Sequence, residues 1–480
     1  MSKSIKKNFL YSSFLTTANY IFPLLTYPYV SRVLGVENIG ICNFVDSIIQ
    51  YFIMFSMLGT VTVGIRAIAQ NRDNQQALDK AFNSVFLINT ISTVIVLIAF
   101  ILFYLLTPKV HTYFYLMVFG AFKIVFNYLQ IEWFYKGIED FKYITLRTLL
   151  VKLAYVFSIF LFIRDCSDYP LYYLLSVLMI VVNALINVKH AKEYVHFSTR
   201  NIEIRKYLRP FFILGIDLFC GAIYTTLNVA YLGFVTNAEQ VGYYTTATKL
   251  YYICLSLYTA FTGVMIPRMS SLCANGEMDK FKAMLSKSYR VLFMFSVPAV
   301  IYVILNANNI IRLIAGKGYE GAVNPLIIIM PLMCILGYKQ VIILQGFLPL
   351  NKNNAILANS AIGAAVSVML SLLLVPRFQA VGTAWVWLFA EFSGLLLSQF
   401  LINKYIGFKF PIAPFCKNIV FYIPMGALLY IISRLIENVW ISLFATSSFF
   451  ILYWGFLNIV ILKEQFVLKL IRSIINKIHK

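Results

Sequence analysis

The stretch YVSRVLGVENIG (residues 29–40) recurs 202 residues later as YLGFVTNAEQVG (residues 231–242). The matched pairs are Tyr29 with Tyr231, Glu37 with Glu239, Gly40 with Gly242, Thr60 with Thr262 and, still without a gap, Arg66 with Arg268. Both copies lie at equivalent points of the hydropathy pattern, which is typical of an internal repeat. The stretch therefore predicts a fold built from two equivalent halves.

The composition places both halves in a membrane. Of the 480 residues, 60% are hydrophobic and 12% are charged, whereas soluble domains carry about 25% charged residues. A helix needs about 20 apolar residues to cross a bilayer, and lipid leaves no other partner for the backbone. Fourteen such segments follow along the chain, centred near residues 20, 52, 93, 120, 153, 179, 221, 254, 297, 335, 365, 391, 424 and 450. The sequence predicts an all-α integral membrane protein with about 14 transmembrane helices.

The repeat also predicts how these spans are organised. Six spans separate the two copies, so both halves enter the membrane in the same direction. This indicates two six-helix lobes related by a parallel pseudo-twofold axis along the membrane normal. We expect an N-terminal lobe at residues 1–200 (spans 1–6), a C-terminal lobe at 201–405 (spans 7–12), two additional C-terminal spans at 406–462 and a tail at 463–480.

The tail, KEQFVLKLIRSIINKIHK, carries its apolar residues on one helical face and its cations elsewhere. This pattern predicts an amphipathic cytoplasmic helix on anionic membrane lipids, with an ordinary solvated tail as the alternative. The chain begins with lysines before an apolar run, but no small-residue cleavage site follows, so we expect an uncleaved first helix.

The net charge of +21 could indicate a nucleic-acid partner, but the distribution of charge argues against one. With the N-terminus inside, cytoplasmic segments hold 29 of the 40 Lys and Arg residues, and external loops hold seven (Arg32, Lys109, Arg164, Arg312, Lys317, Arg377 and Arg434). This asymmetry fits the positive-inside rule and predicts that both termini are cytoplasmic. The seven cysteines and four histidines form no cluster, so we expect no disulfide, metal, cofactor or catalytic site.

Polar residues recur inside the second helix of each half. Lys249, Tyr252, Ser256, Thr259 and Gly263 share one helix face, and Asn43, Asp46 and Gln50 share a face of the equivalent helix. Polar groups facing lipid are costly, so both faces should point to a bundle interior or a wet cavity. Two readings remain open: a cavity that uses Lys249, or a structural ion pair between Lys249 and Asp46.

Further ionisable residues lie within the predicted spans. Cations at these depths attract phosphate or pyrophosphate, and carboxylates that change protonation can couple ion movement to transport. Arg66 and Arg268 lie at cytoplasmic ends, where either the positive-inside rule or an inner vestibule explains them. The candidates are Arg66, Lys123, Lys249, Arg268 and Lys339 for substrate binding, and Asp46, Asp217 and Glu391 for ion coupling.

Three segments carry a family resemblance. RVLGVENIGICNFVDSIIQYF (32–52), IEWFYKGIEDFKYITLR (131–147) and GYYTTATKLY (242–251) resemble the polysaccharide-repeat-unit flippases, the Wzx-type O-antigen transporters. These belong to the superfamily of the multidrug and toxin extrusion transporters and the lipid II flippases. The resemblance implies a V-shaped, two-lobed fold whose first, second, seventh and eighth helices line a cavity. Because lipid II flippases carry essential arginines on those helices, it adds Arg32 to the substrate-binding candidates.

The resemblance also implies a function. A transporter, not an enzyme, would move undecaprenyl-pyrophosphate-linked repeat units of O-antigen, capsule or a similar polymer from the cytoplasmic to the periplasmic leaflet by alternating access. It would lie in the bacterial cytoplasmic (inner) membrane, with polysaccharide polymerase and chain-length machinery as expected partners. Two alternatives stay open, namely an ion-coupled exporter of drugs or small molecules and a membrane-embedded polysaccharide polymerase.

Overall fold

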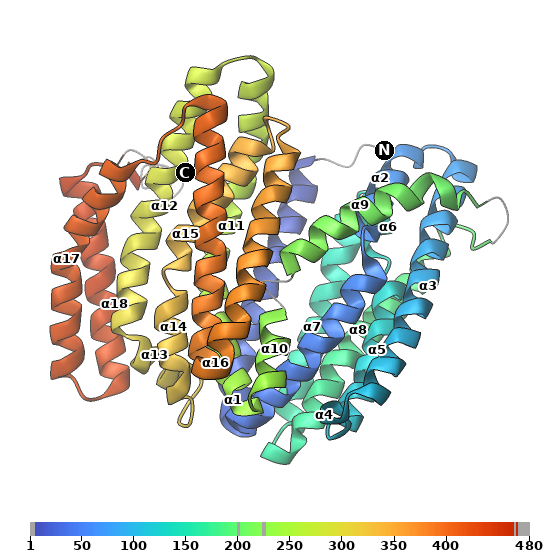
Figure 1. Cartoon of the computed structure of the whole chain (residues 1–480), viewed down its shortest axis with the longest axis horizontal. Coiled ribbons are helices and arrows are strands. Elements are labelled where there is room, and N and C mark those ends of the chain that lie inside the picture. The colour runs from blue at the N-terminus through green and yellow to red at the C-terminus, as the bar shows by residue number, and fades with distance from the viewer. Residues whose placement is uncertain (1–4, 199–201, 223–226, 465–466, 469–480) are drawn as a thin grey trace, which may run out of the picture. The chain divides into compact units, whose positions relative to one another are not determined.

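The computed structural model describes residues 5–198, 202–222, 227–464 and 467–468, and these residues form helices and short turns without a β-strand (Figure 1). The side chains of Asp217, Ser256 and Thr259, the surroundings of Gly263 and most of the 463–480 tail lie outside the described residues. The all-helical architecture confirms the predicted fold class.

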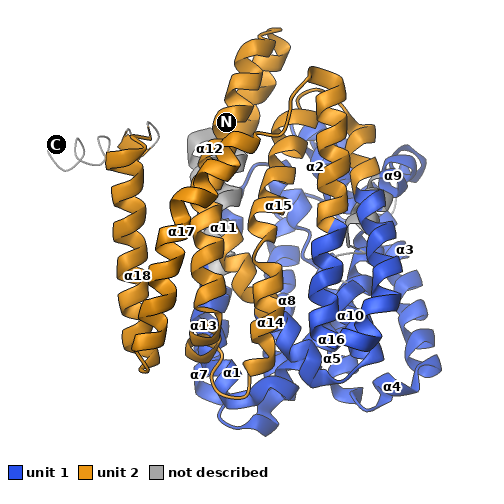
Figure 2. Ribbon diagram, turned by 60° about the vertical axis from the view of Figure 1, so that its left-hand side comes forward, with its two compact units in different colours: residues 1–246, 360–390 blue, residues 247–359, 391–480 orange. Residues whose placement is uncertain are grey.

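The chain forms two compact units, coloured separately in Figure 2. Unit 1 comprises residues 1–246 and 360–390, and unit 2 comprises residues 247–359 and 391–480. Unit 1 contains α1 (Ile5–Met57), α2 (Thr60–Asn71), α3 (Gln75–Leu106), α4 (Pro108–His111), α5 (Phe114–Leu129), α6 (Glu132–Gly137), α7 (Phe141–Phe162), η1 (Cys166–Asp168), α8 (Tyr169–Ala191), α9 (Ile204–Ala222) and α10 (Asn228–Val235).

Two helices contribute to both units, namely α11 (Ala238–Ala274) and α16 (Asn353–Ile406). The remaining elements belong to unit 2: α12 (Met278–Leu305), α13 (Ala307–Ile314), η3 (Glu320–Ala322), α14 (Val323–Ile329), α15 (Leu332–Gln340), the π-helix η4 (Val341–Phe347), α17 (Ile412–Leu435), α18 (Val439–Phe456) and η5 (Leu457–Ile461). The units follow packing contacts and not the repeat, so the predicted lobe boundaries at residues 200 and 405 stay a prediction.

The helices account for the fourteen predicted spans. Ten helical stretches among the described residues are long and apolar enough to cross a membrane. Two of them, at residues 21–71 and 353–406, are 51 and 54 residues long and hold two predicted spans each. The two remaining spans, predicted near residues 221 and 254, are centred on residues of α9 and α11.

Each half breaks its helix at the same point of the repeat. The long α1 bends at Gly35, whose φ of 75° lies in the left-handed region that glycine tolerates best. The position 202 residues later is Asn237, which lies in the break between α10 and α11. Lys109 holds the end of α10 in place, since its Nζ donates to the carbonyl oxygens of Phe234 at 2.8 Å and Thr236 at 3.0 Å. Partial burial lowers the pKa of Lys109.

Just after these breaks, α1 and the first turns of α11 come into backbone contact. A Cβ atom on Gly40 would lie 1.7 Å from the Ala238 carbonyl oxygen, and one on Gly242 would lie 2.3 Å from the Val36 carbonyl oxygen. Val36 and Ala238 are themselves 202 residues apart, so the contact is reciprocal, as it is about a twofold axis.

The same relation holds for a hydrogen bond one turn further on. The Asn43 side-chain amide donates to Thr245 Oγ1 at 2.9 Å, and these residues are again 202 positions apart. Residues that the sequence repeat aligns therefore meet in space, which supports the predicted pseudo-twofold relation between the two halves.

This contact leads to a stability prediction. We expect Gly40→Ala and Gly242→Ala each to lower the thermal stability of the purified protein, because a methyl group would force the two backbones apart at a loss of about 1–3 kcal/mol or more. Gly455→Ala in α18 is the matched control, since a Cβ there meets nothing within 4 Å. Equal melting temperatures for the three variants would contradict the close crossing.

Candidate functional site: two buried lysine–carboxylate pairs

The first pair lies in unit 1, where α1, α5 and α8 pack together. Lys123 on α5 is only 7% exposed, and its Nζ forms an ion pair with Asp46 on α1. The Tyr173 hydroxyl on α8 donates to the same carboxylate at 3.3 Å, and the Tyr173 ring centroid lies 5.9 Å from Lys123 Nζ. Three helices thus surround the buried lysine, whereas the Asp46 side chain remains 34% exposed.

A glycine brings α5 close enough for this pair to form. Gly120 lies one turn before Lys123, and a Cβ atom there would lie 2.4 Å from the Ile49 side chain of α1. Small residues let transmembrane helices approach closely. The sequence motif that positions the pair is therefore Gly120-x-x-Lys123 facing Asp46-x-x-Ile49.

The second pair lies in unit 2. Lys339 near the end of α15 forms an ion pair with Glu391 on α16, and the two residues are 4% and 2% exposed. The fully buried Tyr251 on α11 lies within electrostatic range of the Glu391 carboxylate. The π-helix η4 begins two residues after Lys339, and such irregular turns are frequent at functional sites.

The two clusters occupy corresponding places in the repeat. Lys123 lies on the fourth span and Lys339 on the tenth, which are equivalent helices of the two halves. In the first half, the acid Asp46 lies on the second span and Tyr173 lies on the sixth. In the second half, Tyr251 lies on the eighth span and the acid Glu391 lies on the twelfth. The position of the cation is kept while its two partners are exchanged.

Burial makes the charges of each pair interdependent. An isolated ionised side chain in an apolar interior is strongly unfavourable, and a buried pair is tolerated only because the opposite charges compensate each other. Four of the nine predicted site residues are thus organised as two neutral units: Asp46, Lys123, Lys339 and Glu391. Sequence reasoning identified all four residues but assigned the cations and the acids to separate roles.

The other candidates are more accessible. Arg66 and Arg268 are exposed, and so is Arg32, whose guanidinium donates to the Pro28 carbonyl oxygen at 2.5 Å. Lys249 is half-buried on α11. Asp46 has Lys123 as its ion-pair partner, so the proposed pairing with Lys249 is not needed to explain either the depth or the charge of Asp46.

One structural network was missed by sequence reasoning. Arg147, 5% exposed, donates to Asn183 Oδ1 at 2.7 Å and to Glu132 Oε1 at 3.3 Å. Both Glu132 and Arg147 belong to the motif at residues 131–147 that carries the family resemblance. Their spacing in sequence is too long for one helix turn, so the sequence alone could not reveal that the motif ties α6 to α7 and α8.

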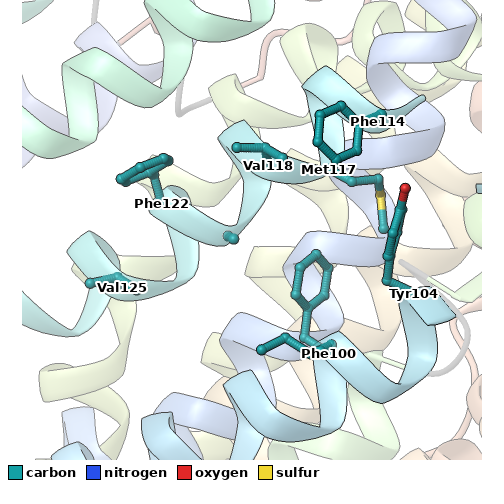
Figure 3. A pocket seen from close by; sticks show the side chains of 9 residues that line it. Phe100, Tyr104, Phe114, Met117, Val118, Phe122 and Val125 are labelled. Carbon is teal, nitrogen blue, oxygen red and sulfur yellow. The ribbon is translucent and has the colours of Figure 1, made fainter. Parts of the chain in front are cut away.

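An apolar groove of about 300 Å³ lies between α3 and α5. Figure 3 shows Phe100, Tyr104, Phe114 and Phe122 among its side chains, and its lining carries no charged residue. It offers nothing to a pyrophosphate group and belongs to the apolar surface of unit 1. Among the described residues, no group of three His, Cys, Asp or Glu side chains could hold a metal ion.

Comparisons with known proteins show the family of this chain and a similar transporter. A family model described as "polysaccharide biosynthesis protein" matches residues 5–273. A putative O-antigen transporter of Escherichia coli (strain K12) is 26% identical over 384 residues, which cover 79% of this chain and 92% of that relative.

Two solved structures share the fold. The lipid II flippase MurJ in an inward closed conformation aligns with a TM-score of 0.79 at 15% identity, over 94% of this chain and 99% of that chain. A multidrug resistance transporter in an inward-facing conformation aligns with a TM-score of 0.65 at 14% identity, over 82% and 98% of the two chains. At these identities the alignments establish the fold.

The ion pair in unit 2 leads to a testable consequence. Lys339→Met should destabilise the protein by about 3–5 kcal/mol because it leaves the Glu391 carboxylate buried without a partner. Adding Glu391→Leu to the same chain should recover most of that loss. Melting temperatures in detergent give the measurement, and Lys280→Met is the control, since its pair with Glu277 is exposed and worth about 0–1 kcal/mol. If Lys339→Met were as stable as the parent protein, the result would mean that the Lys339–Glu391 pair is solvated.

Proposed function

Because the chain belongs to the polysaccharide biosynthesis protein family, we propose that it is a flippase for lipid-linked oligosaccharides. It moves undecaprenyl-pyrophosphate-linked repeat units of O-antigen, capsule or a similar polymer from the cytoplasmic to the periplasmic leaflet by alternating access. The O-antigen transporter relative and the lipid II flippase fold support this assignment. The observation that carries it within the chain is the pair of buried lysines, one in each half.

The substrate poses a specific physical problem. A pyrophosphate group carries its charge through a medium in which ions are unfavourable by many kcal/mol, so the path must supply cations. We assign first contact with the pyrophosphate to the exposed arginines Arg32, Arg66 and Arg268, whose planar guanidinium groups bind phosphate oxygens in pairs. Lys249, half-buried on the same helix as Arg268, continues the cationic path.

The buried pairs then couple binding to a second ion. A lysine held by a carboxylate is unavailable to phosphate, but protonation of that carboxylate would release it. Asp46 and Glu391 would therefore take up a proton, or a sodium ion, as Lys123 and Lys339 turn to the pyrophosphate. Asp217, the third predicted coupling residue, lies on α9 and its side chain is outside the described residues.

The location and partners follow from the same assignment. The protein is a multi-pass membrane protein, and we place it in the bacterial cytoplasmic membrane with both termini cytoplasmic. The polyprenyl tail stays in lipid while the head group crosses. Polysaccharide polymerase and chain-length machinery would use the product on the outer face.

A drug exporter is the alternative that the fold also permits, since a multidrug transporter aligns with the chain. Such a protein needs carboxylates that can receive an organic cation. Here the half-buried carboxylate Asp46 and the buried carboxylate Glu391 are each already paired with a lysine, which favours an anionic substrate.

Loss of the gene separates the candidate functions. We expect a deletion strain to accumulate lipid-linked repeat units whose head groups remain on the cytoplasmic side of the membrane. A drug-sensitive strain with normal surface polysaccharide would instead identify an exporter, and single repeat units displayed on the surface would identify a polymerase.

The arginines provide a site-specific test. Arg66→Ala and Arg268→Ala should each reduce surface polysaccharide without lowering protein abundance, and replacement by Lys should be tolerated better because it keeps the charge. Arg72→Ala is the matched control, since Arg72 is a surface residue at the end of the same helix as Arg66 and is paired with Glu139 at 2.7 Å. Normal polysaccharide in the Arg66/Arg268 double alanine variant would remove both residues from the site.

The coupling role is tested in reconstituted vesicles. Asp46→Asn and Glu391→Gln should make the rate of head-group translocation independent of the proton gradient, because an amide cannot exchange a proton in this pH range. A parent protein whose rate is unchanged when the proton gradient is collapsed would rule out proton coupling and leave the sodium version to be tested with a sodium gradient.

A further inference from the structure

A polar pocket, separate from the ion pairs, lies where three segments of unit 2 meet. It has a volume of about 380 Å³ and is bounded by α12, the first turns of α17, and the chain that follows α18. Its polar lining consists of Arg290, Lys417, Asn418, Asn458 and Glu464. None of these residues has a role in the proposed translocation path.

Hydrogen bonds hold the walls of this pocket in place. Asn458 is fully buried and donates to the Tyr422 hydroxyl at 2.9 Å and to the Trp454 carbonyl oxygen at 2.8 Å. The Glu464 backbone N–H donates to the Asn458 carbonyl oxygen at 2.9 Å, which folds the chain after α18 back towards the pocket. Trp454 Nε1 ties α18 to the Met294 carbonyl oxygen of α12 at 3.1 Å.

The polar groups of this pocket are incompletely satisfied. Within the described part of the chain, Arg290, Lys417 and Glu464 form no ion pair within 4.0 Å, although all three line the same pocket. The buried Asn458 side-chain oxygen accepts no hydrogen bond from any described residue. The pocket therefore presents two cations, Arg290 and Lys417, and one carboxylate, Glu464.

The position of the pocket indicates a membrane interface. Basic residues gather at this end of unit 2, including Lys404, Lys409 and Lys463, and the positive-inside rule assigns such an end to the cytoplasmic leaflet. On the same segments, Val420 and Ile423 of α17 and Val460 of η5 are exposed apolar side chains, which a bilayer would cover. A molecule in this pocket would have its polar part between charged residues and its apolar part against these helices.

We propose that the pocket binds the headgroup of phosphatidylethanolamine. Its phosphate oxygens lie between Arg290 and Lys417, and its ammonium group donates to Glu464. Basic pockets between transmembrane helices bind lipid phosphates at the cytoplasmic side. A headgroup with only negative charge would be repelled by Glu464, and a choline headgroup has no N–H group to donate. The charges that line the pocket therefore select a headgroup with a primary amine.

Lipid retention by the purified full-length protein tests the site directly. In native mass spectrometry with equal amounts of dioleoyl phosphatidylethanolamine, phosphatidylcholine and phosphatidylglycerol, we expect phosphatidylethanolamine to be retained about tenfold better than phosphatidylcholine, the worth of one charge-assisted hydrogen bond. Lys417→Gln and Arg290→Gln should each reduce this retention about tenfold. Thermal melting of each variant checks that it folds.

The same helix supplies a matched control. Arg434 lies at the other end of α17, is exposed, and contacts the ring of Tyr430, as Lys417 contacts that of Phe421. Arg434→Gln should retain the lipid like the parent protein. Equal losses in Lys417→Gln and Arg434→Gln would mean that only the general surface charge matters and would overturn the site.

Two further measurements identify the ligand. Glu464→Gln should abolish the preference for phosphatidylethanolamine over phosphatidylglycerol while some lipid is still retained; an unchanged preference would overturn the role of the amine. Displacement of the lipid by millimolar inorganic phosphate would show that the pocket takes a soluble phosphate and would overturn the lipid assignment. Because retention is measured without transport, either result leaves the proposed flippase function standing or falling on its own tests.

Discussion

The close crossing of α1 and α11 at Gly40 and Gly242 is the constraint on which the arrangement of unit 1 depends. In a membrane there is little hydrophobic force between helices, so association relies on close van der Waals packing and on hydrogen bonds between them. The two glycines remove the side chains that would separate the backbones, and the Asn43–Thr245 hydrogen bond forms one turn beyond them. All these residues are related by the repeat, so equivalent positions of the two halves form the two sides of the contact.

The lysine clusters show what such a duplication keeps and what it lets change. A cation is present on the same helix of each half, at Lys123 and Lys339, whereas the acid and the tyrosine have exchanged helices. A buried lysine needs an anion within contact distance, but the helix that supplies it is unconstrained as long as it faces the same interior. Neutrality of the cluster, and not the identity of each position, is therefore what the fold requires.

The sequence was sufficient to predict a membrane protein, its number of spans and its internal repeat. Spans follow from local hydropathy, and the repeat follows from matching residues at a constant spacing. It also identified Asp46, Lys123, Lys339 and Glu391, since ionisable residues stand out in apolar spans. It could not pair them, because the partner of a side chain depends on the rotation of each helix about its axis. Asp46 is the instructive case: a pair with Lys249 was one of two readings that the sequence left open, and the structure gives Asp46 an ion pair with Lys123 of α5, which the sequence did not predict.

The lysines of the neutral ion pairs cannot bind an anionic substrate while they are paired. The proposed function therefore requires other cations that bind the substrate first. Free lysines in an apolar interior would lose their protons or destabilise the fold, so buried cations must be kept with anions until they are needed. Exposed arginines such as Arg66 and Arg268 face no such restriction, because the guanidinium keeps its proton in any environment. For the proposed translocation of a pyrophosphate, permanent cations would therefore make the first contact, and lysines released from their carboxylates would act later. Arg66 and Arg268 are exposed while Lys123 and Lys339 are buried beside carboxylates, as this division requires, and the buried Arg147 is instead held by Asn183 and Glu132.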